Sequence, residues 1–256
     1  MAEFDRGPTD AFAELCARVP DPPDETAFWV HWGPIFHRGR VDGSARVLVV
    51  ASDPGATERI AGRSLVGNAG QRVQGFLAKL GLTRSYVCLN AWAYAVLPSR
   101  APAMKERLAE PAQTQWRNEV YDTATGPALQ AVVAMGYMAQ EAVRLWPARP
   151  PQAVLVEVPH PTSHDPVALL DGWRAAITTL RPVVRPDEDG DNTGPNYGAA
   201  FEEGDYRPIP RRDLPFGAPA FLGDDAWVRT GGGETQSSVT RPSPDDGRTL
   251  IWKAPG

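Results

Sequence analysis

The sequence has little cysteine and no long apolar run, and each shortage excludes a class of protein. Its 256 residues include two cysteines, Cys16 and Cys88, too few for a disulfide framework or for a four-cysteine metal or iron–sulfur site. No stretch approaches the ~20 apolar residues of a membrane span, and the first residues lack the basic and apolar regions of a signal peptide. These shortages favour a reducing, cytoplasmic location and no membrane partner.

A strongly basic patch is also missing, although the charge is unevenly spread. The formal net charge is −5. From Pro186 onward the chain has 13 acidic and 7 basic residues, whereas the preceding part has 18 acidic and 19 basic residues. The acidity therefore belongs to the C-terminal part, and it does not exclude a body that binds nucleic acid.

The C-terminal part is rich in proline and glycine, with 9 and 11 of its 71 residues. That composition is typical of low-complexity segments. Seven aromatic side chains within it nevertheless predict an extended arm held on the body by aromatic contacts. These aromatic residues are Tyr197, Phe201, Tyr206, Phe216, Phe221, Trp227 and Trp252. A short strand is expected over 249–253.

Elsewhere, buried strands alternate with amphipathic helices. The strands are predicted over 47–51, 86–91, 131–136 and 153–158. Helices are predicted over 9–19, over 103–124 with an interruption at Pro111, and over 137–146. Two further helices carry Val73 to Leu80, with Gly81 as the stop signal, and Leu170 to Leu180, and the glycine-rich segment 62–70 is expected to be a loop. This alternation predicts a three-layer α/β/α fold with a central, mainly parallel four-stranded sheet. We expect an N-terminal helix within 1–24, an α/β domain over 25–185 and an acidic arm over 186–256.

Three polar residues follow three of the predicted strands: Asp53, Asn90 and His160. The carboxyl ends of parallel strands share one edge of the sheet, where open α/β folds bind ligands. A carboxylate there can position water or stabilise an oxocarbenium-like sugar. An amide can read a base edge, and an imidazole can donate to a developing oxyanion. Each residue alone is commonly structural, so the ordered set carries the hypothesis.

The ordered set resembles the uracil-DNA glycosylase superfamily from about Val47 to Leu180. Ala51-Ser52-Asp53-Pro54-Gly55 is similar to the first motif of the family, and Leu65-Val66-Gly67-Asn68-Ala69-Gly70-Gln71 resembles a stretch of its iron–sulfur-bearing bacterial branch. Leu89-Asn90-Ala91 resembles the strand with the base-reading asparagine, and His160-Pro161-Thr162-Ser163 resembles the last motif. The cysteine ligands of that branch are missing, so the resemblance implies a divergent bacterial member without a cluster.

The resemblance implies a monofunctional DNA glycosylase of base excision repair that flips a uracil-like, damaged or modified base and hydrolyses its N-glycosidic bond. It implies single- or double-stranded DNA as the partner, a monomer, and no cofactor or metal. The roles it implies are catalysis by Asp53 and His160, base binding by Asn90, Gly55 and Leu65, and DNA binding by Thr162, Ser163, His164 and Arg63. Arg72, Arg84 and Arg100 are further candidates for phosphate contacts.

Three positions depart from the family pattern. Leu65 stands where the family has an aromatic that stacks on the base, Gly55 where the classical enzymes have a tyrosine that bars 5-substituted bases, and Ser52 where the bacterial branch has Glu. We therefore hypothesise a roomier base pocket. The alternatives are a catalytically inactive glycosylase-fold protein that binds nucleic acid or a nucleotide, and a glycosidase that acts on free nucleosides.

Two further patterns have alternative interpretations. His160 and His164 have a metal-like spacing, but Pro161 and Pro166 oppose a helix that would align the two rings. The aromatic segment 28–36 is expected either to pack on the core or to form a wall of the site. Trp92 and Tyr94 could equally line the pocket or pack in the core.

Overall fold

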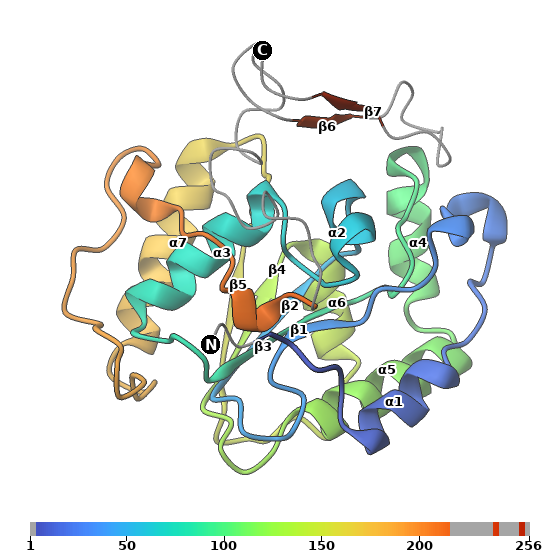
Figure 1. Ribbon diagram of the computed structural model, residues 1–256, viewed down its shortest axis with the longest axis horizontal. Coiled ribbons are helices and arrows are strands. Elements are labelled where there is room, and N and C mark those ends of the chain that lie inside the picture. Colours follow the sequence, from blue (N-terminus) through green and yellow to red (C-terminus); the bar gives the residue numbers. More distant parts are fainter. Residues whose placement is uncertain (1–3, 216–237, 241–250, 254–256) are drawn as a thin grey trace.

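The computed structural model describes residues 4–215, 238–240 and 251–253. At its centre is a five-stranded sheet in the order β1-β3-β2-β4-β5 (Figure 1). Its strands are β1 (His37–Gly39), β2 (Val47–Ala51), β3 (Tyr86–Asn90), β4 (Ala131–Met135) and β5 (Val154–Val158). Strands β2 to β5 are parallel, and β1 runs antiparallel to β3. The predicted α/β fold with a mainly parallel sheet is confirmed.

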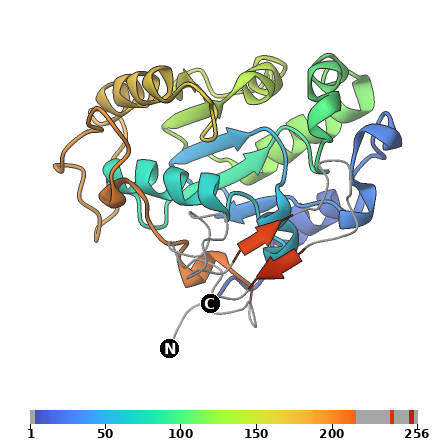
Figure 2. The same cartoon turned by 90° about the horizontal axis from the view of Figure 1, so that it is seen from above.

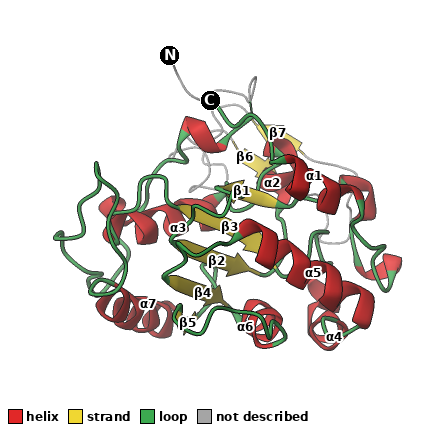
Figure 3. Ribbon diagram, turned by 90° about the horizontal axis from the view of Figure 1, so that it is seen from below, coloured by secondary structure: helices red, strands yellow, loops and turns green. Residues whose placement is uncertain are grey.

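Helices cover both faces of this sheet (Figures 2 and 3). They are α1 (Asp10–Ala17), α2 (Ala56–Ala61), α3 (Asn68–Lys79), α4 (Ala101–Arg107), α5 (Pro111–Ala124), α6 (Tyr137–Arg144) and α7 (Pro166–Leu180). Short 3₁₀ turns lie at Glu25–Ala27, Val30–Trp32, Pro98–Arg100, Glu203–Asp205 and Arg211–Asp213. Across the part of the chain that is described, no helix is both long and apolar enough to cross a membrane.

The central strand β2 shows why the sequence builds three layers. Its five residues are all buried, and successive side chains point to opposite faces. Val47 and Val49 belong to the core cluster that includes α3 and α7, whereas Leu48 belongs to the cluster that includes α1, α5 and α6. A strand covered on both faces needs a continuous apolar run, and this run fixes β2 in the centre of the sheet.

The prediction of four strands was wrong because β1 adds a fifth. This strand has only three residues, His-Arg-Gly, and no apolar alternation from which it could be recognised. Arg38 within it is fully buried, and its guanidinium donates to the side chains of Gln74 (2.7 Å) and Asp213 (2.9 Å). A polar strand can therefore lie in the interior because residues distant in sequence satisfy its charge.

Two predicted boundaries also change. The helical segment expected over 103–124 with an interruption at Pro111 is two helices, α4 and α5, and Pro111 occupies the first position of α5, where its missing N–H costs nothing. The glycine-rich segment 62–70 is not all loop, because α3 begins at Asn68. Gly81, expected as the stop signal of this helix, has φ +71° just after its end.

The first part of the predicted arm, residues 186–215, packs on the body. Asp187 accepts hydrogen bonds from the backbone N–H groups of Thr83, Arg84 and Ser85 at 2.8–3.0 Å. Aromatic contacts of Tyr197 and Phe201 with Trp173 of α7 confirm the expected aromatic anchoring for these two residues, and Tyr206 packs on Phe201 within the arm. Phe216, Phe221 and Trp227 lie outside the described residues. The division into three parts at 24 and 185 stays a prediction.

The short strand expected over 249–253 is confirmed at Ile251–Lys253, which forms β7. It pairs antiparallel with β6 (Ser238–Thr240) in a separate two-stranded sheet. Thr249 and Leu250 lie outside the described residues.

Candidate active site

A cavity of about 340 Å³ lies at the carboxyl edge of the parallel strands. Five of the predicted site residues line it together: Asp53, Gly55, Leu65, His160 and Thr162. They come from the loops after β2 and β5 and from the segment before α3. Its other walls are Trp29, Ala51, Pro54, Glu58, Ala69, Val96, Pro98 and Ala101. Of the three strand-end residues, Asp53 and His160 line this cavity, whereas Asn90 does not.

Asp53 is held at this edge by backbone groups of the neighbouring chain. Its Oδ2 accepts a hydrogen bond from the N–H of Val96 at 2.8 Å. The preceding Ser52 accepts at its carbonyl from the N–H of Trp92 at 3.0 Å. The carboxylate is half-buried and lines the cavity, so one oxygen is oriented by Val96 while the group borders the space available to a ligand.

Asn90 ends β3 directly beside the end of β2, since its Cα is paired with that of Ala51. Only 9% of the residue is exposed, and its Nδ2 donates to the Ser64 hydroxyl at 3.3 Å. Within the described residues its Oδ1 has no hydrogen-bond partner. A buried acceptor without a partner costs about 1–3 kcal/mol. Asn90 is not among the residues that line the cavity, so this predicted base-binding amide lies at the neighbouring strand end, outside the cavity wall.

The His160 ring has a defined orientation. Its Nδ1 accepts a hydrogen bond from the backbone N–H of Thr162 at 3.2 Å and lies 2.9 Å from the Thr162 Oγ1. Because a backbone N–H can only donate, the neutral ring carries its proton on Nε2. Burial lowers the pKa of His160 from 6.5 to about 4, so at neutral pH the ring is an uncharged donor.

Gly136 provides the space that the His160 ring needs. It follows β4 with φ +86°, a conformation that glycine adopts without strain. A Cβ on this residue would lie 2.9 Å from the Cβ of His160. The end of β4 therefore positions the imidazole by leaving out a side chain.

Glu58 is a site residue that the sequence reasoning missed. The residue is 7% exposed, and its carboxylate accepts hydrogen bonds from the backbone N–H groups of Gly55, Val66 and Gly67 at 3.0, 2.8 and 2.9 Å. It thereby joins the loop after β2 to the loop before α3. The signal was present, because Glu occupies the third position of α2 after the capping Gly55.

The predicted base-binding residues Gly55 and Leu65 form walls of the cavity. A Cβ on Gly55 would lie 2.7 Å from the Glu58 Oε2, so a larger residue there would displace this carboxylate. Leu65 is buried with φ +52°, and a Cβ on Gly70 would lie 1.7 Å from its carbonyl oxygen. Close packing on α3 therefore fixes the Leu65 backbone.

The aromatic segment around residue 30 is both core and wall. Trp29 lines the cavity, and its ring stacks on Trp32 with centroids 5.0 Å apart and an angle of 9°. Trp92 instead packs edge-on against Phe28, 5.2 Å between centroids, inside a core cluster. Trp92 is thus a core residue, and Trp29 is the aromatic side chain that lines the cavity.

The loop after His160 presents its side chains outward. Thr162 and His164 are exposed, and Ser163 is half-buried. Ser163 and His164, with His160, line a second, open hollow beside Tyr137, which is 46% exposed. Within the described residues there is no group of three or more His, Cys, Asp or Glu side chains arranged to hold a metal ion.

The predicted phosphate-binding arginines differ in their partners and in their exposure. Arg63 forms an ion pair with Asp5. Arg72 donates to the carbonyl of Pro161 at 2.6 Å and to the Tyr206 hydroxyl at 3.0–3.1 Å. Arg84 pairs with Asp189 at 3.0 Å, and Arg100 is exposed. Arg72 thus connects the loop after His160 to the C-terminal arm.

Residues 38–164 match the protein-family model described as the uracil DNA glycosylase superfamily. The match spans β1 to the loop after β5 and includes the cavity residues Asp53, Gly55, Leu65, His160 and Thr162. A search of curated proteins finds no match to the chain.

Proposed function

The chain belongs to the uracil DNA glycosylase superfamily through residues 38–164, and on this premise we propose that it is a monofunctional DNA N-glycosylase. It would flip a uracil-like, damaged or modified base out of DNA and hydrolyse the N-glycosidic bond, leaving an abasic site. Its biological setting would be base excision repair in the cytoplasm, with the chain acting as a monomer. The observation that carries the proposal is the cavity shared by Asp53 and His160.

The volume of the cavity suits a single base better than a whole nucleotide. About 340 Å³ is at the low end of ligand pockets, which span roughly 300–1,000 Å³. An extruded nucleotide can place its base there while its sugar and phosphates stay outside. Trp29 and Leu65 supply apolar walls for the faces of a base, and the Asn90 Oδ1 lies at the adjoining strand end as an acceptor for an N–H of the base.

The two catalytic residues have complementary roles in this proposal. Bond cleavage leaves negative charge on the departing base and positive charge on the sugar. The Nε2–H of neutral His160 donates to an oxygen of the base as that charge develops, which favours departure. The Asp53 carboxylate stabilises the oxocarbenium-like sugar and orients a water, whose oxygen bonds to the anomeric carbon and whose proton neutralises the base.

The surface around the cavity supports binding of DNA through the loop after His160. Thr162 and His164 are exposed on this loop, and two large apolar side chains flank it: Tyr137, 46% exposed, and Val167, 66% exposed. Exposed apolar side chains beside a base-sized cavity are suited to fill the gap left by a flipped nucleotide. Arg63, bound to Asp5, would contact DNA only after exchange of its ion pair.

The proposal is tested with oligonucleotides, single- and double-stranded, that carry uracil, hypoxanthine, xanthine or 5-hydroxymethyluracil. Abasic sites are detected by alkaline strand scission. We expect scission with at least one base, and a fall of about 10²-fold or more in His160→Ala and in Asp53→Asn. His31→Ala and Asp171→Asn are matched controls, because both residues are exposed and lie outside the cavity.

The same panel separates the alternatives. DNA binding without scission of any oligonucleotide would favour a catalytically inactive glycosylase-fold protein. Hydrolysis of free nucleosides alone would favour a nucleosidase. Efficient cleavage of uracil with refusal of every 5-substituted base would contradict the roomier pocket expected from Gly55.

A further inference from the structure

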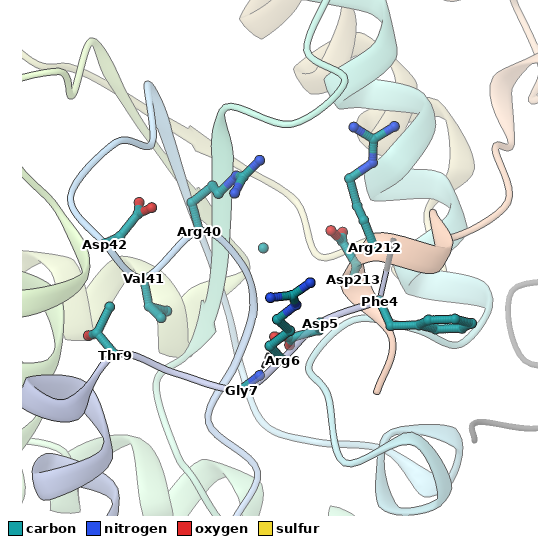
Figure 4. A pocket seen from close by; sticks show the side chains of 11 residues that line it. Phe4, Asp5, Arg6, Gly7, Thr9, Arg40, Val41, Asp42, Arg212 and Asp213 are labelled. Carbon is teal, nitrogen blue, oxygen red and sulfur yellow. Dashed lines mark hydrogen bonds between the residues drawn. The ribbon is translucent and has the colours of Figure 1, made fainter. Parts of the chain in front are cut away.

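A second pocket, of about 220 Å³, lies at the edge strand β1 (Figure 4). It is formed by residues 4–9, the segment 39–42 that follows β1, and residues 212–213 of the arm. The N–H of Arg40 donates to the carbonyl of Tyr86, the first residue of β3, at 2.8 Å. Asn90 is the last residue of β3, so this pocket lies toward the opposite end of the strand from the candidate active site.

The acidic side chains of the pocket are occupied by other partners. Asp5 binds the guanidinium of Arg63 and the backbone N–H of Gly7. Asp42 accepts from the N–H and hydroxyl of Ser44. Asp213 accepts from buried Arg38 at 2.9 Å and from the hydroxyl of Tyr86 at 2.7 Å. The three carboxylates therefore already accept hydrogen bonds from groups of this chain.

The basic side chains of the pocket are not occupied in this way. Arg6, Arg40 and Arg212 line it, and none of their guanidinium groups has a hydrogen bond or ion pair to another described residue. Figure 4 shows Arg40 and Arg212 on opposite sides of the pocket with Arg6 between them. Arg40 and Arg212 are only half-exposed. Arg40 also interacts electrostatically with Asp42, without a hydrogen bond to it. Partly desolvated guanidinium groups that lack hydrogen-bond partners favour an anion as ligand.

The backbone holds these arginines in place. The N–H of Asp5 donates to the carbonyl of Leu214 at 3.0 Å, and Asp5 forms a parallel bridge with Pro215. Arg6 and Arg212 therefore lie on two segments that are tied together, while Arg40 directly follows β1. The pocket exists because residues 4–9 and residues 212–215 both dock on this edge of the sheet.

From this charge arrangement we propose that Arg6, Arg40 and Arg212 form a binding site for a phosphate group. Guanidinium forks match phosphate oxygens in bidentate hydrogen bonds. Three guanidinium groups that approach from separate segments suit a tetrahedral anion better than a planar carboxylate. The volume is below the usual range of pockets for drug-sized ligands, so only the phosphate group enters. The phosphate is either a diester of the DNA backbone or the terminal group of a nucleotide.

The test is a titration of the full chain with inorganic phosphate in chloride buffer, in which isothermal titration calorimetry measures the binding. We expect saturable binding that weakens as the salt concentration rises. Arg40→Gln, Arg212→Gln and Arg6→Gln should each weaken it about tenfold or more. Arg185→Gln is the matched control, since Arg185 is an exposed arginine outside the pocket. Acetate should bind at least tenfold more weakly than phosphate.

Two further titrations identify the source of the phosphate, one with a nucleoside monophosphate and one with a uracil-free oligonucleotide that lacks terminal phosphates. Whichever ligand loses affinity in Arg40→Gln and Arg212→Gln is the one the site takes. No saturable binding of inorganic phosphate, or equal affinity in the wild type and all three variants, would overturn the proposal. Arg6 is exposed, so Arg6→Gln keeps the test valid should another variant fail to fold. Neither result depends on glycosylase activity.

Discussion

The backbone N–H of Thr162 donates to the Nδ1 of His160 at 3.2 Å, and this contact determines which nitrogen of the neutral ring carries the proton. Nδ1 can accept only while it is unprotonated, so the proton of the neutral ring is on Nε2. The local turn of the loop and the chemistry of the ring are thereby coupled: a proton on Nδ1 would break the hydrogen bond to Thr162.

The pH dependence of the fold follows from this coupling. Burial lowers the pKa of His160 to about 4, below the 6.5 of an ordinary histidine. Between these values the unfolded chain binds more protons than the folded one at this site, so the stabilising contribution is present above pH 6.5 and is lost as the pH falls toward 4. We expect the unfolding free energy of the wild type to fall relative to that of His160→Gln across this window. NMR titration of the ring should give a midpoint near 4, and a midpoint near 6.5 would refute the coupling.

Substitution of Gly136 should displace the imidazole. In Gly136→Ala the new methyl group meets the His160 Cβ at 2.9 Å, and the residue keeps a φ of +86° that alanine adopts only with strain. We expect a loss of about 1–3 kcal/mol in unfolding free energy and a lower rate of base excision. Urea unfolding and single-turnover kinetics measure the two effects. Gly204→Ala is the control, because a Cβ there has no described atom within 4 Å; equal behaviour of the two variants would contradict this account.

Neutralising Glu58 should loosen the two loops that frame the cavity. Its carboxylate accepts three backbone N–H groups, from Gly55, Val66 and Gly67. Glu58→Gln replaces one acceptor oxygen by an amide donor, which faces N–H groups that then lack a partner. We expect a loss of about 2 kcal/mol or more in unfolding free energy, together with weaker substrate binding. Glu119→Gln, in an exposed ion pair with Arg18, should change stability by less than about 1 kcal/mol.

Removing Arg72 should loosen the loop after His160, because Arg72 connects this loop to the C-terminal arm. Its guanidinium donates to the Pro161 carbonyl and lies over the rings of Phe201 and Tyr206, 4.5 and 5.5 Å from their centroids. Arg72→Gln should lower the rate of excision several-fold and make the segment 198–206 more sensitive to protease. Tyr206→Phe keeps the ring contact and loses the hydroxyl that accepts from Arg72, so its effect should be smaller. A larger effect of Tyr206→Phe than of Arg72→Gln would show that Arg72 does not connect the two segments.

Deleting the arm should destabilise the body. Without residues 186–256 the buried guanidinium of Arg38 loses Asp213, and the N–H groups of Thr83, Arg84 and Ser85 lose Asp187. Removing one partner of a buried ion pair costs about 3–5 kcal/mol. We therefore expect a clear fall in thermal midpoint on deletion from residue 186, and a much smaller one on truncation after Pro215. Equal midpoints for the full chain and the deletion variant would contradict this structural role.

The strand ends were predictable from sequence because their signals are local. A run such as Val47 to Val50 can only be a strand buried on both faces, and the polar residue after it marks the edge where ligands bind. Asp53, Asn90 and His160 could therefore be predicted as one site without coordinates, and two of them, Asp53 and His160, line the same cavity. The resemblance to a known family added the chemistry that these residues would perform.

What the sequence concealed depends on contacts between distant segments. β1 is a strand only because Arg38 finds Gln74 and Asp213, 36 and 175 residues away in the chain. The pairing of Arg72 with the arm, at a separation of 134 residues from Tyr206, removes it from the set of free surface charges. Glu58 was recognisable as a helix cap, but its second contact with Val66 is visible only in three dimensions.

The catalytic role of the cavity is tested by measuring the release of free base from DNA under single-turnover conditions, with mass spectrometry as the readout. We expect the wild type to release an excised base and to leave an abasic site. We expect Asp53→Asn and His160→Ala to be slower by about 10²-fold or more, and Asp171→Asn to be unchanged. Release at the wild-type rate by Asp53→Asn and His160→Ala would contradict the assignment of the cavity as the active site. The absence of any released base across the panel would contradict the proposed reaction.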